Sequence, residues 1–400
     1  MLRYLTAGES HGKLINTIVD GVPSGLKLTG EEINNELRRR QQGYGRGGRM
    51  KIERDEVEIT SGVRFGMTTG APLSLIIRNR DWDNWKNRMS ILPRSERENP
   101  LTLPRPGHTD LAGGLKYLEK DMRNILERSS ARETACRVAV GTVSRILLKV
   151  FDIRVISTVL QIGEVCAENV PSNPLEIYRR SEKSDVRCAD SGAEEKMRSA
   201  IDEAKKNGDS LGGVLQVIAT NPPPGLGNAF QWDRKLDARL AFALMSIQAI
   251  KGVEVGTGFK CAGLPGSKVH DEIFYRKPRP TYSYSGRKTG GFYRRTNNAG
   301  GIEGGISNGE NIIVNAVMKP IPTLTNSLRS VDLDTGKTVK AAVERSDVCA
   351  VPAASVVAEA VVAYEIANAF LEKFGGDSLT ETKKNFKLYM DAVIKYSQKG

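Results

Sequence analysis

The sequence predicts a single α+β domain, and three observations support that class. Segments with strand-like alternation and longer segments with helical periodicity both occur along the 400 residues. No internal repeat is present, and no linker divides the chain. Hydrophobic residues make up 39% of the chain and charged residues 26%, which is typical of a globular protein with an ample core. We therefore expect residues 1–400 to fold as one unit.

The N-terminal part is expected to form strands and one capped helix. The strands are expected at 2–5, 57–63 and 73–77. Thr29 and Glu32 have the spacing of a capping box, which predicts a helix from there to about Arg40, where a glycine-rich loop begins. The stretch 81–104 has no clear period, and we interpret it as an insertion or a flap.

The rest of the chain adds longer helices and three more strands. Ser130 and Glu133 repeat the capping-box spacing and predict a helix that runs to about residue 150. Small residues dominate 353–374, which favours a closely packed helix, and a polar peripheral tail is expected from about residue 376. Two other helices are expected at 193–207 and 233–251, and the strands at 154–162, 213–219 and 312–318.

The net charge of +12 favours a polyanionic partner. Two classes of partner fit this charge, namely nucleic acid and a small metabolite with several negative charges. The sign of the charge does not separate them. However, basic residues are not interleaved with aromatic ones as they are in RNA-recognition motifs, which argues against nucleic acid.

Cysteine usage and hydropathy favour a cytoplasmic protein. The five cysteines are scattered, odd in number and never spaced as C-x-x-C, so we expect neither disulfides nor a metal site. No apolar run approaches the roughly 18 to 20 residues that cross a bilayer. The N-terminus also lacks the pattern of a cleavable signal, so we expect no membrane partner.

Two of the three histidines lie in turns that contain glycine. His11 belongs to Gly8-Glu-Ser-His-Gly12, and His108 belongs to Arg105-Pro-Gly-His-Thr-Asp110. Glycine lets the backbone turn tightly and approach a ligand, so either imidazole can face a pocket. Imidazole gives or takes a proton near neutral pH, and the nearby arginines suggest acid–base chemistry on an anion. For either histidine alone, a structural turn residue is an equal alternative, and His270 has no such setting.

Arginines recur beside these turns and beside a predicted helix start. Guanidinium groups bind phosphate and carboxylate in bidentate fashion, so several on one ligand would hold a polyanion tightly. Ser129 and Ser130 open the helix expected at 130–150, where free N–H groups favour an anion. Each feature alone has an ordinary alternative, a solvated arginine or a plain N-cap. The arginines concerned are Arg40, Arg46, Arg105, Arg128, Arg132 and Arg345.

Asp347 is the acidic candidate, in Glu344-Arg-Ser-Asp-Val348. It is either the ion-pair partner of Arg345 or a base or proton relay beside the ligand. Motifs for other chemistries are missing, because the chain has no phosphate-binding P-loop and no G-x-S-x-G elbow. Gly301-Ile-Glu-Gly-Gly305 lacks the strand-then-helix context of a dinucleotide fingerprint.

As a set, these motifs resemble the chorismate synthase family. They follow the family's order from residue 8 to about 375, so the resemblance covers nearly the whole chain. The matching segments are 8–12, 38–49, 105–110, 128–135, 304–307, 319–323 and 345–347. Neither the stretch 81–99 nor the tail is expected to touch a motif.

The resemblance implies an enzyme that converts 5-enolpyruvylshikimate 3-phosphate to chorismate and phosphate by anti-1,4-elimination, the last step of the shikimate pathway. It implies a requirement for reduced FMN without net redox change, with electrons from NADPH or from a separate flavin reductase. It also implies a β-α-β sandwich, with central helices between two antiparallel sheets, that assembles as a homotetramer. A substrate with one phosphate and two carboxylates accounts for many arginines better than nucleic acid does.

The resemblance also implies roles for individual residues. His11 resembles the acid that protonates the departing phosphate, and His108 the group that keeps the reduced flavin correctly protonated. Asp347 resembles the acid that helps flavin N5 accept the substrate proton. The substrate positions are matched by Ser10, His11, Arg40, Arg46, Arg105 and Arg132, of which Arg40 and Arg46 are also the family's NADPH positions. The flavin positions are matched by Arg128, Ser129, Ser130, Gln248, Ala249, Gly304, Lys319, Pro320, Ile321, Pro322, Thr323 and Arg345.

Two other function classes stay open at this point. A flavin reductase would oxidise NADPH without the enolpyruvyl substrate, and the missing dinucleotide fingerprint argues against it. A nucleic-acid-binding protein would show salt-sensitive affinity, and the lack of aromatic stacking platforms argues against that class.

Overall fold

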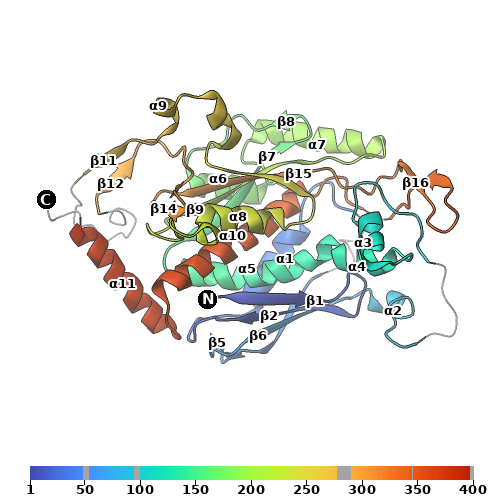
Figure 1. Cartoon of the computed structure of the whole chain (residues 1–400), viewed down its shortest axis with the longest axis horizontal. Helices are drawn as coiled ribbons and strands as arrows, with labels where there is room; N and C mark the ends of the chain where they lie inside the picture. Colours follow the sequence, from blue (N-terminus) through green and yellow to red (C-terminus); the bar gives the residue numbers. More distant parts are fainter. Residues whose placement is uncertain (48–53, 94–99, 277–289, 345, 397–400) are drawn as a thin grey trace.

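The computed structural model spans the whole chain and describes every residue except 48–53, 94–99, 277–289, 345 and 397–400. It confirms the α+β class, because helices and antiparallel sheets both occur (Figure 1). The helices are α1 (Gly30–Gln41), α2 (Trp82–Trp85), α3 (Asp110–Tyr117), α4 (Arg123–Ser129), α5 (Thr134–Lys149), α6 (Pro174–Lys183), α7 (Ser191–Lys206), α8 (Leu236–Met245), α9 (Gly266–Val269), α10 (Val351–Phe374) and α11 (Leu379–Tyr396).

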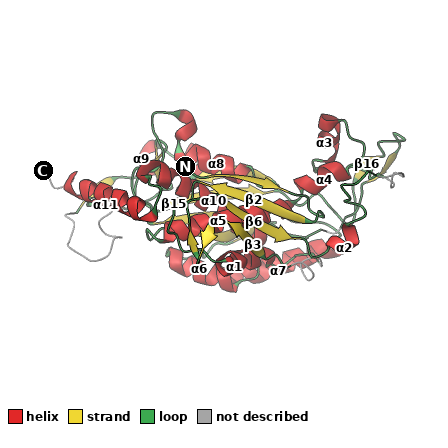
Figure 2. Ribbon diagram, turned by 90° about the horizontal axis from the view of Figure 1, so that it is seen from below, coloured by secondary structure: helices red, strands yellow, loops and turns green. Residues whose placement is uncertain are grey.

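A four-stranded antiparallel sheet forms near the N-terminus (Figure 2). Its strands run in the order β1 (Arg3–Ala7), β2 (Leu14–Asp20), β6 (Leu73–Arg78) and β3 (Val57–Ser61). Ile15 pairs with Ile77, and both side chains are buried in the main core, whereas Leu5 and its partner Ile18 are exposed. β2 was not expected from the sequence, because its hydrophobic residues occur as adjacent pairs rather than in strict alternation.

A five-stranded antiparallel sheet forms the second layer of strands. Its strands run in the order β10 (Ile250–Val255), β15 (Ile312–Met318), β9 (Gly213–Thr220), β7 (Arg154–Ile162) and β8 (Val165–Cys166). β7, β9 and β15 confirm the expected strands. The remaining strands of the described residues form four short antiparallel pairs. These are β4 (Val63–Arg64) with β5 (Met67–Thr68), β11 (Ile273–Tyr275) with β12 (Phe292–Arg294), β13 (Ile302–Glu303) with β14 (Ile306–Ser307), and β16 (Arg329–Val331) with β17 (Thr338–Lys340).

The helix expected at 233–251 is too long. α8 ends at Met245, and β10 begins at Ile250, which pairs with Met318 of β15. Ala249 lies in the turn between them with φ of 67°, a left-handed conformation that stops a helix. Pairing with a distant strand therefore overrides the local helical periodicity at this point.

α5 and α10 pack against each other between the two sheets. α5 contacts β1, β2 and β6 of the four-stranded sheet and also β7 of the five-stranded sheet, whereas α10 contacts β7 and β9 (Figures 1 and 2). A Cβ added to Gly141 of α5 would lie 2.4 Å from the Cα and Cβ of Ala360 of α10. The two helices can therefore approach this closely only because Gly141 has no side chain.

By length and composition, α10 could also cross a membrane, contrary to the expectation that no segment approaches such a length. In the structure, 89% of its most apolar 18-residue window is buried inside the fold. Core helices pass the same composition test, and burial between α5 and the five-stranded sheet accounts for the hydropathy of α10.

A buried ionic cluster fixes α1 relative to α5 and α10. The carboxylate of Glu359 in α10 pairs with Arg39 at 2.8 Å, Arg145 at 3.2 Å and Arg187 at 3.1 Å. Burial opposes ionisation of Glu359, but the three guanidinium charges outweigh it and lower its pKa to about 2. The cluster holds the last turn of α1, from which Arg40 projects.

The two predicted capping boxes have different outcomes. The first is confirmed, because Thr29 Oγ1 accepts from the Glu32 N–H at 3.3 Å and Glu32 accepts from the Thr29 N–H at 3.1 Å. The second is wrong in part. Ser130 caps a short 3-10 turn that precedes α5, and the Glu133 carboxylate pairs with Arg137 at 2.9 Å. The Ser130 hydroxyl donates instead to Ser10 Oγ at 3.1 Å.

The C-terminal segment forms α11, which begins at Leu379. Phe386 of α11 is buried among three other aromatic rings, with centroid distances of 5.1 Å to Phe151, 5.5 Å to Phe370 and 5.1 Å to Phe374. α11 therefore docks on the core through one apolar face. It lies at the end of the molecule opposite to α2 and α3 (Figure 1).

Candidate active site

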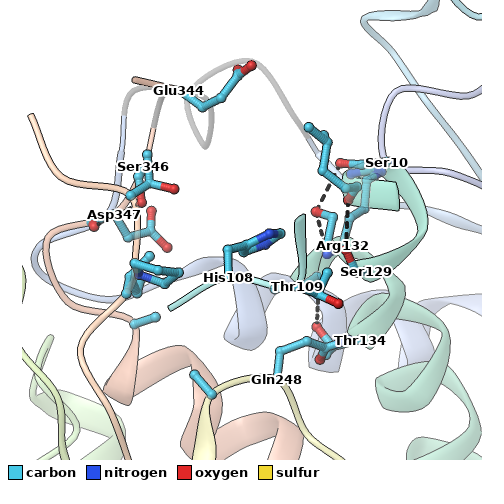
Figure 3. Close-up of a pocket in the computed structure, with 18 of the residues that line it drawn as sticks. Ser10, His108, Thr109, Ser129, Arg132, Thr134, Gln248, Glu344, Ser346 and Asp347 are labelled. Carbon is cyan, nitrogen blue, oxygen red and sulfur yellow. Dashed lines mark hydrogen bonds between the residues drawn. The ribbon is translucent and has the colours of Figure 1, made fainter. Parts of the chain in front are cut away.

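A cavity of about 1020 Å³ lies where the ends of several distant segments meet (Figure 3). Among its described lining residues are eight arginines or lysines and three aspartates or glutamates, so its walls attract an anion. The sequence-predicted residues that line it are Ser10, His11, Arg40, Arg46, Arg105, His108, Ser129, Ser130, Arg132, Gln248, Ala249, Lys319, Ile321, Pro322, Thr323 and Asp347.

His11 is held by a carboxylate that the sequence analysis did not identify. Its Nδ1 lies 2.8 Å from Oε1 of Glu127 in α4, and its backbone N–H donates to Oε2 at 2.8 Å. Arg123 pairs with the same carboxylate at 3.1 Å. Burial opposes ionisation of Glu127, but the hydrogen bonds and charge of His11 and the charge of Arg123 lower its pKa. Because an ionised carboxylate only accepts hydrogen bonds, His11 is the donor in the Nδ1 contact.

Trp85 of α2 covers one face of His11. The two rings stack with centroids 3.7 Å apart and an interplanar angle of 23°. The indole N–H donates to Asp81 at 3.0 Å, and the Arg123 guanidinium lies 5.3 Å from the ring centroid. The expectation that the stretch 81–99 touches no motif is therefore wrong for its described part. Nothing periodic in the sequence marks this contact, because α2 is only four residues long.

His108 has a similar arrangement, built from a neighbouring residue. Its Nδ1 lies 2.5 Å from Oδ1 of Asp110, the first residue of α3. Arg105 donates from Nε to the same carboxylate at 2.8 Å and from Nη1 to Thr323 at 3.0 Å. Burial opposes ionisation of Asp110, but hydrogen bonds and charge from His108 and Arg105 hold its pKa well below the usual range. The short loop thus fixes both His108 and Arg105.

Arg40 and Arg132 share one buried carboxylate. Asp55, with an exposed fraction of 2%, lies 3.2 Å from Arg40 and 3.0 Å from Arg132. Arg40 also donates to Thr134 Oγ1 at 2.9 Å and to the Ala131 carbonyl at 3.0 Å. These contacts bring the end of α1 and the start of α5 to the same wall of the cavity.

Asp347 is held by residues from the glycine-rich loop rather than only by its own segment. It pairs with Arg46 at 2.8 Å and accepts from the Gly47 N–H at 2.7 Å. Arg345, which the sequence analysis paired with it, lies outside the described residues. In Figure 3, the imidazole of His108 lies between Asp347 and Ser346 on one side and Arg132 and Ser10 on the other.

Two further segments form the floor of the cavity. Gln248 and Ala249 lie in the turn between α8 and β10, and the Ala249 carbonyl accepts from the Lys319 N–H at 2.9 Å. The Lys319 ammonium donates to the carbonyl of Gly107, next to His108. Burial, with a smaller contribution from the charge of Lys251, lowers the pKa of Lys319.

Of the predicted flavin residues that the structure describes, three do not line the cavity. Arg128 is exposed and donates to the carbonyls of Gly8 at 3.2 Å and Thr6 at 2.9 Å, so its guanidinium holds the end of β1. Gly304 lies in the turn between β13 and β14, and Pro320 lies between two lining residues.

The sequence analysis missed three carboxylates and two other groups at the site, namely Asp55, Asp110, Glu127, Trp85 and Arg123. Asp110 had a local signal, because it lies two residues after His108 in the quoted motif. The others had none, because a contact between residues far apart in sequence leaves no short-range pattern.

In this α+β fold, two carboxylate-backed histidines meet in a basic cavity, an arrangement suited to acid–base chemistry on a small anion. The profile of the family described as chorismate synthase matches residues 2–371. A chorismate synthase of Pelobacter propionicus is 60% identical over 394 residues, which cover 98% of this chain and 99% of that relative. One of Geotalea uraniireducens is 57% identical over 393 residues, with the same coverage. A crystal structure of a chorismate synthase has a TM-score of 0.79 and 44% identity over 98% of each chain. The chain therefore belongs to the chorismate synthase family, as its motifs predicted.

Proposed function

We propose that this chain is a carbon–oxygen lyase that converts 5-enolpyruvylshikimate 3-phosphate to chorismate and phosphate. The reaction is an anti-1,4-elimination that uses reduced FMN without net redox change. One observation carries the proposal, namely that two carboxylate-backed histidines and, among the described residues, eight arginines or lysines meet around one cavity of about 1020 Å³. A triply anionic substrate matches that excess of positive charge.

His11 acts as the acid for the departing phosphate. The acid form is the protonated ring, in which Nδ1–H faces Glu127 and the proton on Nε2 passes to a ligand in the cavity. Ser10 lies beside it and accepts from the Ser130 hydroxyl. The guanidinium groups that orient the phosphate and carboxylates are those of Arg40, Arg46, Arg105 and Arg132.

The residues present fit a flavin. Gln248 Oε1 is buried in the cavity wall with no hydrogen-bond partner among the described residues, so it is suited to an imide N–H such as the flavin ring carries. Reduced FMN supplies the electron density that makes cleavage of the allylic C–O and C–H bonds feasible. The residues that would hold it are Ser129, Ser130, Gln248, Ala249, Lys319, Ile321, Pro322 and Thr323.

His108 and Asp347 manage protons on the flavin side of the cavity. Asp110 occupies Nδ1 of His108, which leaves Nε2 as the nitrogen that exchanges a proton with a ligand. Arg46 and the Gly47 N–H hold the Asp347 carboxylate in place, where it relays the proton taken from the substrate.

The proposal extends to features of the whole protein. The single-domain, β-α-β sandwich arrangement is supported by α5, which contacts strands of both sheets, by α10, which contacts the five-stranded sheet, and by one core cluster that includes Leu2 and Met390. By analogy with the family, the protein is a cytoplasmic homotetramer with no nucleic-acid or membrane partner. Its flavin is reduced by NADPH, with Arg40 and Arg46 at the NADPH positions, or by a separate flavin reductase.

An anaerobic assay with photoreduced FMN tests the proposal. Phosphate and chorismate should appear from the enolpyruvyl substrate with reduced FMN, and neither should appear with oxidised FMN. NADPH oxidation without the substrate, in the absence of phosphate release, would instead identify a flavin reductase. Salt-sensitive binding to single or double strands, again without lyase activity, would identify a nucleic-acid-binding protein.

A further inference from the structure

Glu127 contacts both the backbone and the ring of His11. Its Oε2 accepts the His11 backbone N–H at 2.8 Å and lies 3.0 Å from the imidazole Nδ1, whereas Oε1 lies 2.8 Å from Nδ1 and accepts from Arg123 at 3.1 Å. The backbone of the same residue reinforces the contact, because the Glu127 carbonyl accepts from the Ser10 N–H at 2.9 Å. With a side chain only 2% exposed, Glu127 is shielded from water that could replace these bonds.

We propose that Glu127 is a positioning residue that keeps a proton on Nδ1 of His11 throughout, so that the protonated ring gives the ligand its Nε2 proton and is left as the neutral Nδ1–H tautomer. Neutral imidazole has two tautomers, and the group on one nitrogen decides which nitrogen carries the proton. A fixed, ionised carboxylate accepts only, so it selects the Nδ1–H tautomer. The inference deepens the proposed function, on which it rests for the identity of the proton acceptor.

The substitution Glu127→Gln should reverse this selection without changing the shape of the side chain. The backbone N–H of His11 can only donate, so the amide oxygen must stay at the position of Oε2. The amide NH2 then takes the Oε1 position, 2.8 Å from Nδ1 against 3.0 Å for Oε2, so Nδ1 becomes an acceptor and the proton of the neutral ring moves to Nε2. Arg123, with a side chain 20% exposed, can turn toward water to avoid the new NH2 group.

The test reads the tautomer directly from ¹⁵N chemical shifts of histidine-labelled protein at mildly alkaline pH, without substrate. With three histidines in the chain, the signals can be assigned with His108→Gln and His270→Gln variants. We expect Nδ1–H at His11 in the wild type and Nε2–H in Glu127→Gln. In parallel, kcat should fall by roughly 10²- to 10⁴-fold while KM changes by less than about threefold.

A matched control is Glu372→Gln, which changes a partly buried glutamate that also has an arginine partner, Arg239 at 2.9 Å, and lies outside the cavity lining. It should leave both the His11 tautomer and kcat unchanged.

The possible outcomes separate the role of Glu127 from the lyase activity on which the inference rests. A wild-type His11 with its proton on Nε2 would overturn the inference even if Glu127→Gln failed to fold. An unchanged tautomer and kcat in the variant would overturn it as well. The predicted tautomers in a protein that releases no phosphate would instead contradict the proposed function and leave the assignment of Glu127 standing.

Discussion

The two histidine sites of the cavity use the same chemistry but are assembled differently. In both, Nδ1 faces a buried carboxylate, and an arginine pairs with that carboxylate. Asp110 is two residues away from His108, whereas Glu127 is 116 residues away from His11. The His108 site therefore lies within one turn of the chain. The His11 site forms only where the segment after β1 meets α4.

This difference indicates which substitutions should disturb each histidine site. Asp110 accepts from the backbone and the side chain of Arg105, so the His108 turn carries its own internal bonds. The position of the His11 ring depends on Glu127, which contacts its Nδ1, and on Trp85, which stacks on its face from a separate short helix. We therefore expect changes at His108 to act locally and changes around His11 to act through packing.

Removal of either imidazole should have the largest effect on turnover. We expect His11→Ala and His108→Ala each to lower kcat by roughly 10²- to 10⁴-fold, the usual contribution of a general acid or base. FMN affinity, measured by fluorescence titration, should change far less. If His108→Ala retained wild-type turnover with reduced flavin, an acid–base role for His108 would be ruled out.

Asp110→Asn should have the largest effect on stability. It leaves the Arg105 guanidinium, 8% exposed, without its charged partner, and breaking such a buried pair costs about 3–5 kcal/mol. Urea unfolding measures this loss. The control Asp334→Asn affects an exposed pair with Lys120 and should change the free energy of unfolding by less than about 1 kcal/mol. Equal losses of unfolding free energy in the two variants would show that the buried Asp110–Arg105 pair stabilises the fold no more than the exposed pair does.

The stability contribution of Asp110 should also depend on pH. Its pKa in the folded protein lies well below the usual range, so the unfolded chain takes up a proton first as the pH falls. The contribution is fully present above the unfolded pKa of about 3.9 and is lost progressively below it. The gap in unfolding free energy between wild type and Asp110→Asn should therefore narrow between about pH 5 and pH 3. A gap that stays constant would contradict this account.

Trp85→Leu should distinguish the two histidine sites. Loss of an aromatic stack costs about 0.5–1.5 kcal/mol, so we expect a roughly 2- to 10-fold fall in kcat with no change in FMN affinity. Trp82→Leu is the matched control, because Trp82 lies on the same short helix but outside the cavity lining. Equal effects of the two substitutions would show that the whole segment, rather than the stack on His11, matters.

The smallest effect is expected from Lys319→Met. It removes the hydrogen bond to the Gly107 carbonyl, which supports the His108 turn. One such bond is worth about 0.5–1.5 kcal/mol, so the Kd for FMN should rise by roughly 2- to 10-fold. Lys116→Met, at an exposed position on α3, should leave the Kd unchanged. A loss of turnover as large as that of His108→Ala would instead place Lys319 in the chemistry.

Much of the fold could be predicted because its signals are local. The Thr29 capping box starts α1, and alternating hydrophobic residues mark β7, β9 and β15. Local patterns predicted the structure wrongly where another contact competes with them. α8 ends before the helical periodicity does, because Ile250 pairs with Met318 of β15. Glu133 does not complete a capping box, because its carboxylate pairs with Arg137.

The sequence by itself determined the family, the α+β class and the turns that present His11 and His108, because motifs and periodicity depend on neighbouring residues. It also contained the Asp110 partner, within hydrogen-bond reach along the chain. Only the tertiary structure decided that Glu127 and Trp85 meet at His11, and that Arg40 and Arg132 share Asp55. These contacts arise from the packing of sheets and helices, and packing joins residues whatever their distance in sequence.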